Sequence, residues 1–237
     1  MQPHRALALR SPTNEPRRAR SGPSREPMVR LRAPMVLLAA AFTMLSCSVI
    51  FADDDAEEKQ RIADILCLHT GQRVADVGAG RGEWAEDLAE RVGSRGRVWA
   101  TEVDEDSLET LRERFREAGL MQVAVVRGDQ EQTGLPPSCC DAVLIRMVYH
   151  HFQDPQAMRK DLQRALRPGG KILIVDIEPQ SGWSELDGVP DRGGHGIPID
   201  DLVDEMAEEG FRAMSRHPEW NGDRDRYAVL FELSRQP

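Results

Sequence analysis

The chain has 237 residues, of which 40% are hydrophobic and 30% are charged, enough for one ordinary domain and an extension. Its formal net charge is −9, and because residues 1–52 hold eight Arg and two Glu, the remaining residues carry a net charge of −15. A domain this acidic repels a phosphate backbone, so we expect no nucleic-acid partner.

The N-terminal part differs in composition from the rest. Residues 1–34 are rich in Arg, Pro and Ser and are predicted to be disordered, and Met28 would be a natural first residue for a signal segment. Residues 35–52 resemble a signal-peptide core or a membrane anchor, because a basic stretch precedes an apolar run over 35–51. Acidic residues come directly after the run, so the positive-inside rule places the domain over 53–237 outside the cytoplasm, exported or anchored. The alternative is a cytoplasmic domain, either left inside behind a membrane anchor or with this segment packed on it as a helix.

Residues 74–82 predict a short buried strand that runs into a glycine-rich turn, and a helix pattern begins at Glu83. Gly78 and Gly80 fit the start of the dinucleotide motif G-x-G-x-x-G, but Glu83 replaces its third glycine and would repel a pyrophosphate. Asp76, at the end of the strand, suits a cationic group such as an amino-acid ammonium.

The remaining elements alternate strands with helices, which predicts a parallel α/β sheet. A strand over 97–102 ends in Glu102, which lies 22 residues after Gly80 and so at the spacing of a ribose-binding acid. The other predicted elements are a helix over 107–117 capped by Asp104 or Asp106, strands over 123–126 and 141–145, a Pro-Gly-Gly break at 168–170 before a strand over 171–176, a helix over 200–209, and a hairpin of strands over 211–216 and 227–232.

Four segments in this order resemble the class I S-adenosylmethionine (SAM) methyltransferases, in particular their type 11 group. They are Asp-x-Gly-x-Gly-x-Gly at 76–82, Gly-Asp-Gln at 128–130, the His-His pair at 150–151 and Leu-Arg-Pro-Gly-Gly at 166–170. The resemblance spans about residues 54–232. It implies a single domain with a doubly wound, mostly parallel seven-stranded sheet, an antiparallel last strand and the strand order 3-2-1-4-5-7-6.

The resemblance also implies the cofactor, S-adenosyl-L-methionine, and the residues that hold it. Asp76 would serve the methionine end, Glu102 the ribose, and Asp129 with Gln130 the adenine. The backbone of Gly78, Ala79 and Gly80 would pass close to the cofactor, and Arg146 would lie beside it. The implied activity is methyl transfer to a small-molecule acceptor, with lipid, quinone and protein side chains also open.

The motifs name no catalytic residue, because methyl transfer from a sulfonium mainly requires alignment of the acceptor. Candidates for a base are Tyr149, His150 and His151, which come after the fourth strand, and His195, in a Gly-rich loop over 179–198. That loop, with Trp183, Arg192 and His195, could be an acceptor lid or a mobile surface loop. Asp176 and Glu178 could face the acceptor or simply solvate this loop.

Two other functions remain open from the sequence: a nicotinamide-dependent oxidoreductase and a SAM-binding protein without activity. No Cys or His spacing of the kind that zinc sites show is present, so we predict no metal. The vicinal pair Cys139-Cys140 could bind a metalloid but is more typical of two small residues entering a buried strand. Membrane association through residues 35–51 is the other partner prediction, and oligomeric state is not predicted.

Overall fold

The computed structural model describes residues 55–181 and 188–234. Its strands are β1 (Arg73–Val77), β2 (Arg97–Glu102), β3 (Val123–Arg127), β4 (Cys140–Arg146), β5 (Leu166–Ile177), β6 (Phe211–His217) and β7 (Arg226–Leu233). Its helices are one over residues 55–66, α2 (Glu83–Val92), α3 (Glu105–Glu117), α4 (Pro155–Ala165) and α5 (Ile199–Glu208), with a 3-10 turn η1 (Tyr149–His151).

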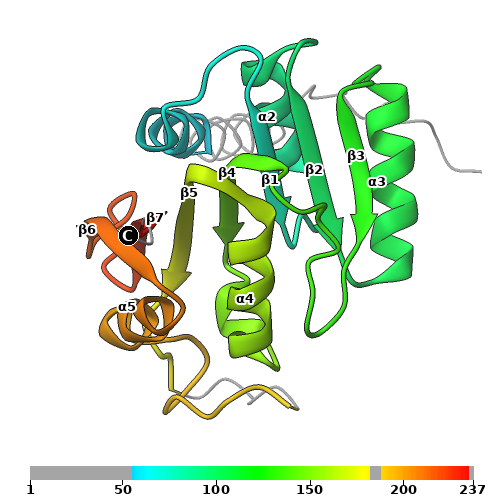
Figure 1. Cartoon of the computed structure of the whole chain (residues 1–237). Coiled ribbons are helices and arrows are strands. Elements are labelled where there is room, and N and C mark those ends of the chain that lie inside the picture. The colour runs from blue at the N-terminus through cyan, green and yellow to red at the C-terminus, as the bar shows by residue number, and fades with distance from the viewer. Residues whose placement is uncertain (1–54, 182–187, 235–237) are drawn as a thin grey trace, which may run out of the picture. The chain divides into compact units, whose positions relative to one another are not determined.

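All seven strands belong to one sheet in the order β3-β2-β1-β4-β5-β7-β6. The first five strands pair in parallel, and β7 inserts antiparallel between β5 and β6 (Figure 1). This confirms the predicted doubly wound sheet and its strand order. Because the first five strands share one direction, their carboxyl ends lie along one edge, where ligands bind in open α/β sheets.

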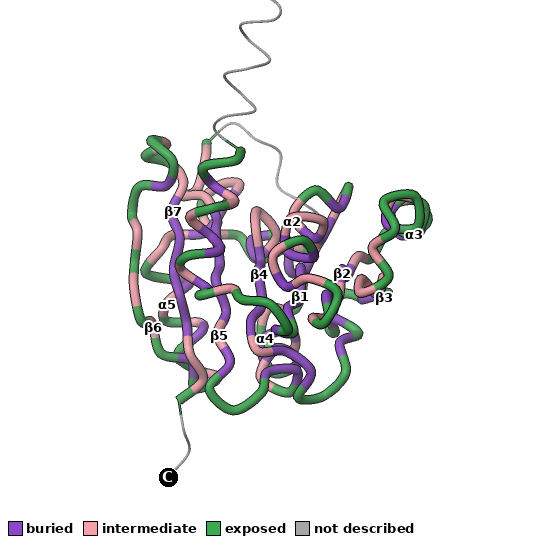
Figure 2. The backbone as a smooth tube through the Cα atoms, turned by 90° about the horizontal axis from the view of Figure 1, so that it is seen from above, coloured by how far each residue is buried: buried purple, intermediate pink, exposed green. Residues whose placement is uncertain are grey.

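The sheet is covered on both faces because successive residues of its strands point to opposite sides. In β1, Val74 joins the apolar cluster under the helix over 55–66, α2 and α3, whereas Ala75 and Val77 join the cluster under α4 and α5. Figure 2 shows the buried strands between these helices. Strands buried on both faces account for the unbroken apolar run of β5.

Two elements begin more than one residue away from their predicted starts. The Pro-Gly-Gly break is wrong as a strand boundary: β5 begins at Leu166, which pairs with Cys140, and the register shifts before Lys171 pairs with Ala142. An irregularity of the pairing, of the β-bulge kind, therefore accommodates Pro168, Gly169 and Gly170 within the strand. Helix α3 begins at Glu105, before the predicted Ser107, and Asp104 caps it by accepting from the Ser107 N–H.

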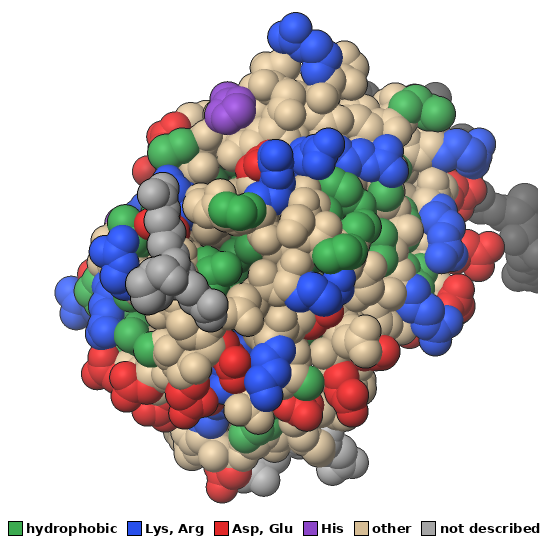
Figure 3. Space-filling model, in the orientation of Figure 1, with side chains coloured by type: hydrophobic (Ala, Val, Ile, Leu, Met, Phe, Trp, Pro, Cys, Tyr) green, Lys and Arg blue, Asp and Glu red, His purple; other side chains and the backbone are tan. Residues whose placement is uncertain are grey.

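The predictions for residues 1–34 and 35–52 lie outside the described residues. Among the helices that are described, none combines the length and the apolar character needed to cross a bilayer. The described surface carries charge of both signs, and Asp and Glu side chains gather over α5, where they make up five of ten residues (Figure 3).

Candidate functional site

The turn after β1 brings its backbone against the ends of neighbouring strands. Gly78 has a φ of +75°, and a Cβ atom there would come within 2.5 Å of a Val148 methyl carbon. The N–H groups of Gly78 and Ala79 both donate to the Thr101 carbonyl, at 3.0 and 2.9 Å. Only glycine both adopts a positive φ readily and lacks the Cβ atom that would clash with Val148 at position 78. Open space surrounds the Cβ position of Gly80, so the turn leaves room for a ligand beside it.

Asp76 is a buried carboxylate with an unsatisfied oxygen. The residue is 3% exposed, and the Ala85 N–H donates to its carboxylate. Within the described part of the chain, its Oδ2 has no hydrogen-bond partner. Burial raises the pKa of Asp76 to about 7, although the nearby Arg146 guanidinium opposes this shift. Buried polar groups are normally satisfied, so this oxygen fits a cationic donor such as the ammonium of the expected cofactor.

Glu102 ends β2 and turns its carboxylate toward the glycine-rich turn. Its Oε2 accepts from the Gly80 N–H at 2.9 Å, and its Oε1 accepts from the Val103 N–H at 2.8 Å. Each carboxylate oxygen has a second lone pair, so Glu102 can still accept from a diol. The contact with Gly80 fixes the carboxylate beside the turn, as a ribose-binding acid requires.

Asp129 begins the loop after β3, and its carboxylate organises that loop. Its Oδ1 accepts from the N–H groups of Glu131 and Gln132, at 2.9 and 2.8 Å. Asp129 and Gln130 are exposed and, with Glu102, line a cavity that is open to solvent. The full lining comprises Val77, Gly78, Thr101, Glu102, Val103, Gly128, Asp129, Gln130, Gln132, Thr133, Val148, His151, Phe152 and Met158.

Arg146, predicted to lie beside the cofactor, is held at the end of β4. Its Nε and Nη2 donate to the two oxygens of Glu58, at 2.8 and 2.9 Å, and its guanidinium stacks 4.2 Å over the Trp84 ring. Glu58 is buried and also accepts from the Trp220 indole N–H at 2.8 Å. Arg146 therefore contributes positive charge near Asp76, while two of its donor nitrogens are engaged by Glu58.

His150 and Asp176 form a buried pair at the ends of β4 and β5. The His150 Nδ1 lies 2.5 Å from the Asp176 Oδ1, and their side chains are 2% and 0% exposed. The backbone N–H of Ile177 also donates to the Asp176 Oδ1. Asp176 therefore orients one imidazole and does not solvate the adjoining loop. With Nδ1 bound to the carboxylate, the Nε2 of His150 is the ring atom left to act on another group.

His151 and His195 lie next to this pair, so three of the four predicted candidates for a base come together. The His195 Nε2 is 3.2 Å from the His150 Nε2, and the ring centroids of His150 and His151 are 4.0 Å apart. Desolvation lowers the pKa of His151 to about 4, and charge repulsion from His150 and His195 adds to the effect. Desolvation also lowers the pKa of His195. His151 lines the cavity described above and is neutral at physiological pH.

Tyr149, the fourth candidate, points away from this group. Its hydroxyl donates to the Glu205 Oε2 of α5 at 2.8 Å and accepts from Arg159 at 3.2 Å. Burial raises its pKa above its ordinary value. Arg192, from the predicted lid, also bonds Glu205, at 2.8 Å, so part of that loop is fastened to α5. Trp183 lies outside the described residues.

Some site residues carried no signal in the sequence. The cavity wall includes the apolar side chains of Val148, Phe152 and Met158. Their spacing reflects the packing of η1 and α4, which has no motif of its own. Glu58 and Trp220 are also missed, because a contact between residues 162 apart leaves no local pattern.

Comparison with known proteins finds methyltransferases that match a large part of the chain. A family model described as a methyltransferase domain matches residues 74–170. The demethylmenaquinone methyltransferase of Listeria welshimeri is 27% identical over 124 residues, which cover 52% of each chain. The ubiquinone/menaquinone biosynthesis C-methyltransferase UbiE of Nitrosospira multiformis is 29% identical over 119 residues, 50% of this chain and 48% of that one. The chain thus matches about half the length of these curated relatives.

Solved structures share the fold. A SAM-dependent methyltransferase from Aquifex aeolicus matches with a TM-score of 0.63 over 75% of this chain and 90% of that chain. The two sequences are 21% identical, so this likeness concerns the architecture.

Proposed function

Because this chain belongs to the class I, Rossmann-like methyltransferases, whose cofactor is S-adenosyl-L-methionine, we propose that it catalyses methyl transfer from SAM to a small-molecule acceptor. The observation that carries the proposal is the buried carboxylate of Asp76, whose Oδ2 has no protein partner among the described residues. A cofactor with an ammonium group supplies the missing donor.

The other polar groups along the same edge suit the remaining parts of SAM. Glu102 can accept hydrogen bonds from the two ribose hydroxyls, and the exposed Asp129 can accept from the adenine amine. Gly78 and Glu102 line one cavity with Asp129 and Gln130, which therefore offers groups for both ends of a nucleoside. A nicotinamide dinucleotide fits less well, because Glu83 begins α2 where the dinucleotide motif has glycine.

SAM supplies a methyl group on a sulfonium, which is already a good leaving group. The protein has to align the acceptor and exclude water. The apolar side chains of Val148, Phe152 and Met158 line the cavity together with the exposed imidazole of His151. The acceptor is therefore expected between these side chains and the loop that carries His195.

For the acceptor itself, we propose a ring that bears a hydroxyl group, with a demethylquinol as the first compound to test. The curated relatives in Listeria and Nitrosospira are named for methylation in menaquinone or ubiquinone biosynthesis. Apolar side chains beside imidazole rings suit a planar ring with a dissociable hydroxyl. The match covers only about half of each relative, so the acceptor is proposed as a chemical class.

The test begins with calorimetric titration of the purified full chain with S-adenosylhomocysteine (SAH) and, separately, with NADH. We expect SAH to bind and NADH not to bind. Mass spectrometry with methyl-deuterated SAM would then detect products from a demethylquinol, a catechol, a thiol and a protein extract. A folded sample that fails to bind SAH would refute the proposal. SAH binding without any product would favour a SAM-binding protein that lacks activity.

A further inference from the structure

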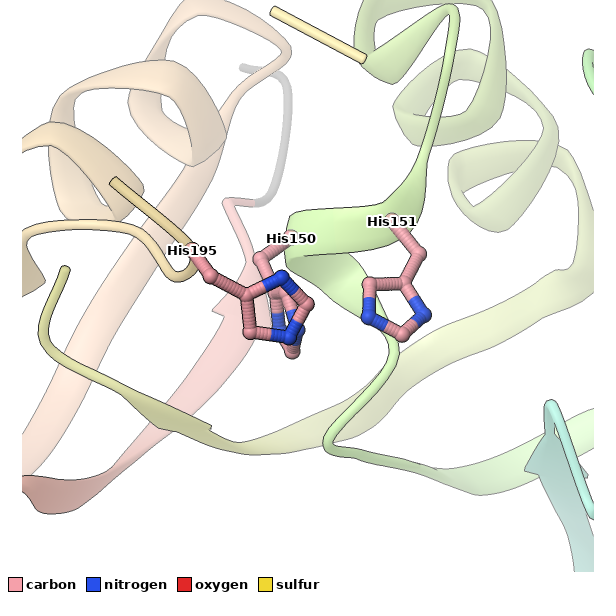
Figure 4. A group of neighbouring side chains, drawn as sticks. All are labelled: His150, His151 and His195. Carbon is pink, nitrogen blue, oxygen red and sulfur yellow. The ribbon is translucent and has the colours of Figure 1, made fainter. Parts of the chain in front are cut away.

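Three imidazoles converge at the mouth of the site. His150 and His151 lie on η1, after β4, and His195 comes from the loop between β5 and α5 (Figure 4). Each offers a ring nitrogen, and these three atoms lie within 4.8 Å of one another. Imidazole nitrogens are ligands for Zn²⁺ and other first-row transition metals. Metal ligands commonly come from separate segments of the chain, so the absence of a sequence motif does not argue against such a site.

The surroundings of His150 match those of a metal-bound histidine. Such a histidine commonly donates its second ring N–H to a carboxylate, which fixes the tautomer and leaves the other nitrogen for the metal. Here the Nδ1 of His150 contacts the fully buried Asp176 at 2.5 Å. The Nε2, on the opposite side of the ring, faces His195. Asp176 would therefore orient the ligand and balance part of the metal charge.

The distance between the first two ligand atoms fits a shared metal ion. Zn–N bonds of 2.0–2.1 Å at a tetrahedral centre place two nitrogens about 3.3 Å apart. The Nε2 atoms of His150 and His195 are 3.2 Å apart. The ring centroid of the exposed His151 lies 4.0 Å from that of His150, and the ligand nitrogens of all three side chains are within 4.8 Å of one another.

The loop that carries His195 is held against the sheet. The backbone of His195 pairs with Gln180 through two hydrogen bonds, of 2.9 and 3.2 Å. Gly196 has a φ of +135°, and a Cβ atom there would lie 2.7 Å from the Ile177 carbonyl oxygen. Only glycine lets the chain pass this close to the end of β5. The position of His195 next to His150 is therefore specified by the backbone.

We propose that His150, His151 and His195 bind a divalent transition-metal ion, best matched by Zn²⁺, with a fourth position open to the acceptor. Three protein ligands and an open position are the pattern of catalytic zinc. His151 lines the cofactor cavity, whereas His150 and His195 line a second hollow formed by residues 189–196. The ion would therefore lie between the cofactor and the loop.

The role of the ion rests on the proposed methyl transfer. Coordination lowers the pKa of a bound hydroxyl, so the acceptor loses its proton to water without a side-chain base. The acceptor oxygen, or a ring carbon made nucleophilic by it, then forms the bond to the methyl group. When the ring carbon is methylated, it afterwards loses its own proton to water, which restores the aromatic ring. The sulfur–methyl bond breaks, and its electron pair stays on sulfur. An acceptor with an acidic hydroxyl is the class that this arrangement selects.

Metal binding can be tested without any acceptor. The full chain, stripped with a chelator, is titrated with Co²⁺ and followed by visible absorption, and Zn²⁺ is then added in competition. We expect one ion per chain, with the absorption of a four-coordinate cobalt site and no thiolate charge-transfer band. His195→Ala should weaken binding about 100-fold or more, since loss of a group that merely orients a ligand already costs about 10- to 100-fold. His69→Ala, an exposed histidine before β1, is the matched control and should bind like the wild type.

SAH titration of the same variants, without metal, reports whether they fold and keep the cofactor site. Several results would overturn the metal proposal: no cobalt binding by the wild type, equal binding by His195→Ala, lost binding in His69→Ala, or a thiolate band that points to the cysteines. If SAH binds and cobalt does not, the metal site fails while the methyltransferase proposal stands. If cobalt binds and SAH does not, the metal site stands while the methyltransferase proposal fails.

Discussion

Replacing Asp76 with Asn changes the charge of the buried carboxylate and little of its shape. Asp76 has a pKa of about 7, against an ordinary value of 3.8, because it is buried with one oxygen unpaired. The folded free protein therefore holds this proton more tightly than the unfolded chain does. The protonated Asp76 carboxyl therefore stabilises the folded protein most below about pH 4. This stabilisation is lost as the pH rises to about 7, and none of it remains above that pH.

The size of the effect can be worked out from the shift. About three pKa units at roughly 1.4 kcal/mol each give a cost of about 4 kcal/mol above neutral pH, as an order of magnitude. Asp76→Asn removes this cost, so the free variant should be more stable than the wild type at about pH 8, by roughly 1 to 4 kcal/mol. Binding should change in the opposite sense. Loss of a buried charged partner costs about 2 kcal/mol or more, which weakens SAH binding by roughly 30-fold or more.

Proton release on binding is the sharper measurement. Near pH 7 about half of the Asp76 carboxyl groups are protonated, and an ammonium ligand requires the charged form, so binding should release about half a proton per site. Calorimetric titration with SAH in buffers of different ionisation enthalpy measures this number, and urea denaturation measures stability. The reasoning would be refuted if Asp76→Asn released the same number of protons, or if it bound SAH as tightly as the wild type.

Two further substitutions test the site. Glu102→Gln should weaken SAH binding by about 10- to 100-fold, because hydrogen bonds to a charged group contribute about 1.5–3 kcal/mol; calorimetry would show this, and the exposed Glu109→Gln should bind normally. Gly78→Ala should lower the free energy of unfolding in urea by about 2–4 kcal/mol, since it adds a clash with Val148 to a strained φ. Gly71→Ala, with a φ of +89° and open space around it, carries the strain alone and should lose about 1–2 kcal/mol; equal losses in the two glycine variants would contradict the packing argument.

The side chains that we propose as the cofactor site could be predicted to lie close together because their signals are local. A strand that leads into closely spaced glycines fixes a turn, and an acid at the end of the next strand falls beside it once the two strands pair. The contact between Glu102 and the Gly80 N–H is a consequence of that arrangement. The alternation of strands with helices predicted a parallel α/β sheet, whereas the order of its strands was implied by the resemblance to the class I methyltransferases and is confirmed by the sheet.

The acceptor side could be predicted only as a set of candidates. Tyr149 and His150 are neighbours in the sequence, yet one faces α5 and the other faces Asp176, because the 3-10 turn sends successive side chains in different directions. The meeting of His150 with His195 depends on a glycine-rich loop that folds back on the end of β5. The bulge in β5 was also missed, because Pro and Gly normally interrupt strands, and only the pairing with β4 keeps this segment extended.

The contact of Glu58 with Arg146 and Trp220 limits how early the domain can finish folding while the chain is being synthesised. These residues are 88 and 162 positions apart, and β7, which covers the outer edge of β5, is the last strand of the chain. A nascent chain that ends before β7 leaves β5 without its partner, and one that ends before Trp220 also leaves Glu58 with a donor missing. We therefore expect such chains on the ribosome to be sensitive to protease and unable to bind SAH. Domains whose strands pair over long sequence separations complete their folding late. Protection that appears before β7 emerges would contradict this order. Cofactor capture would then follow the emergence of β7 and could not guide the earlier steps of folding.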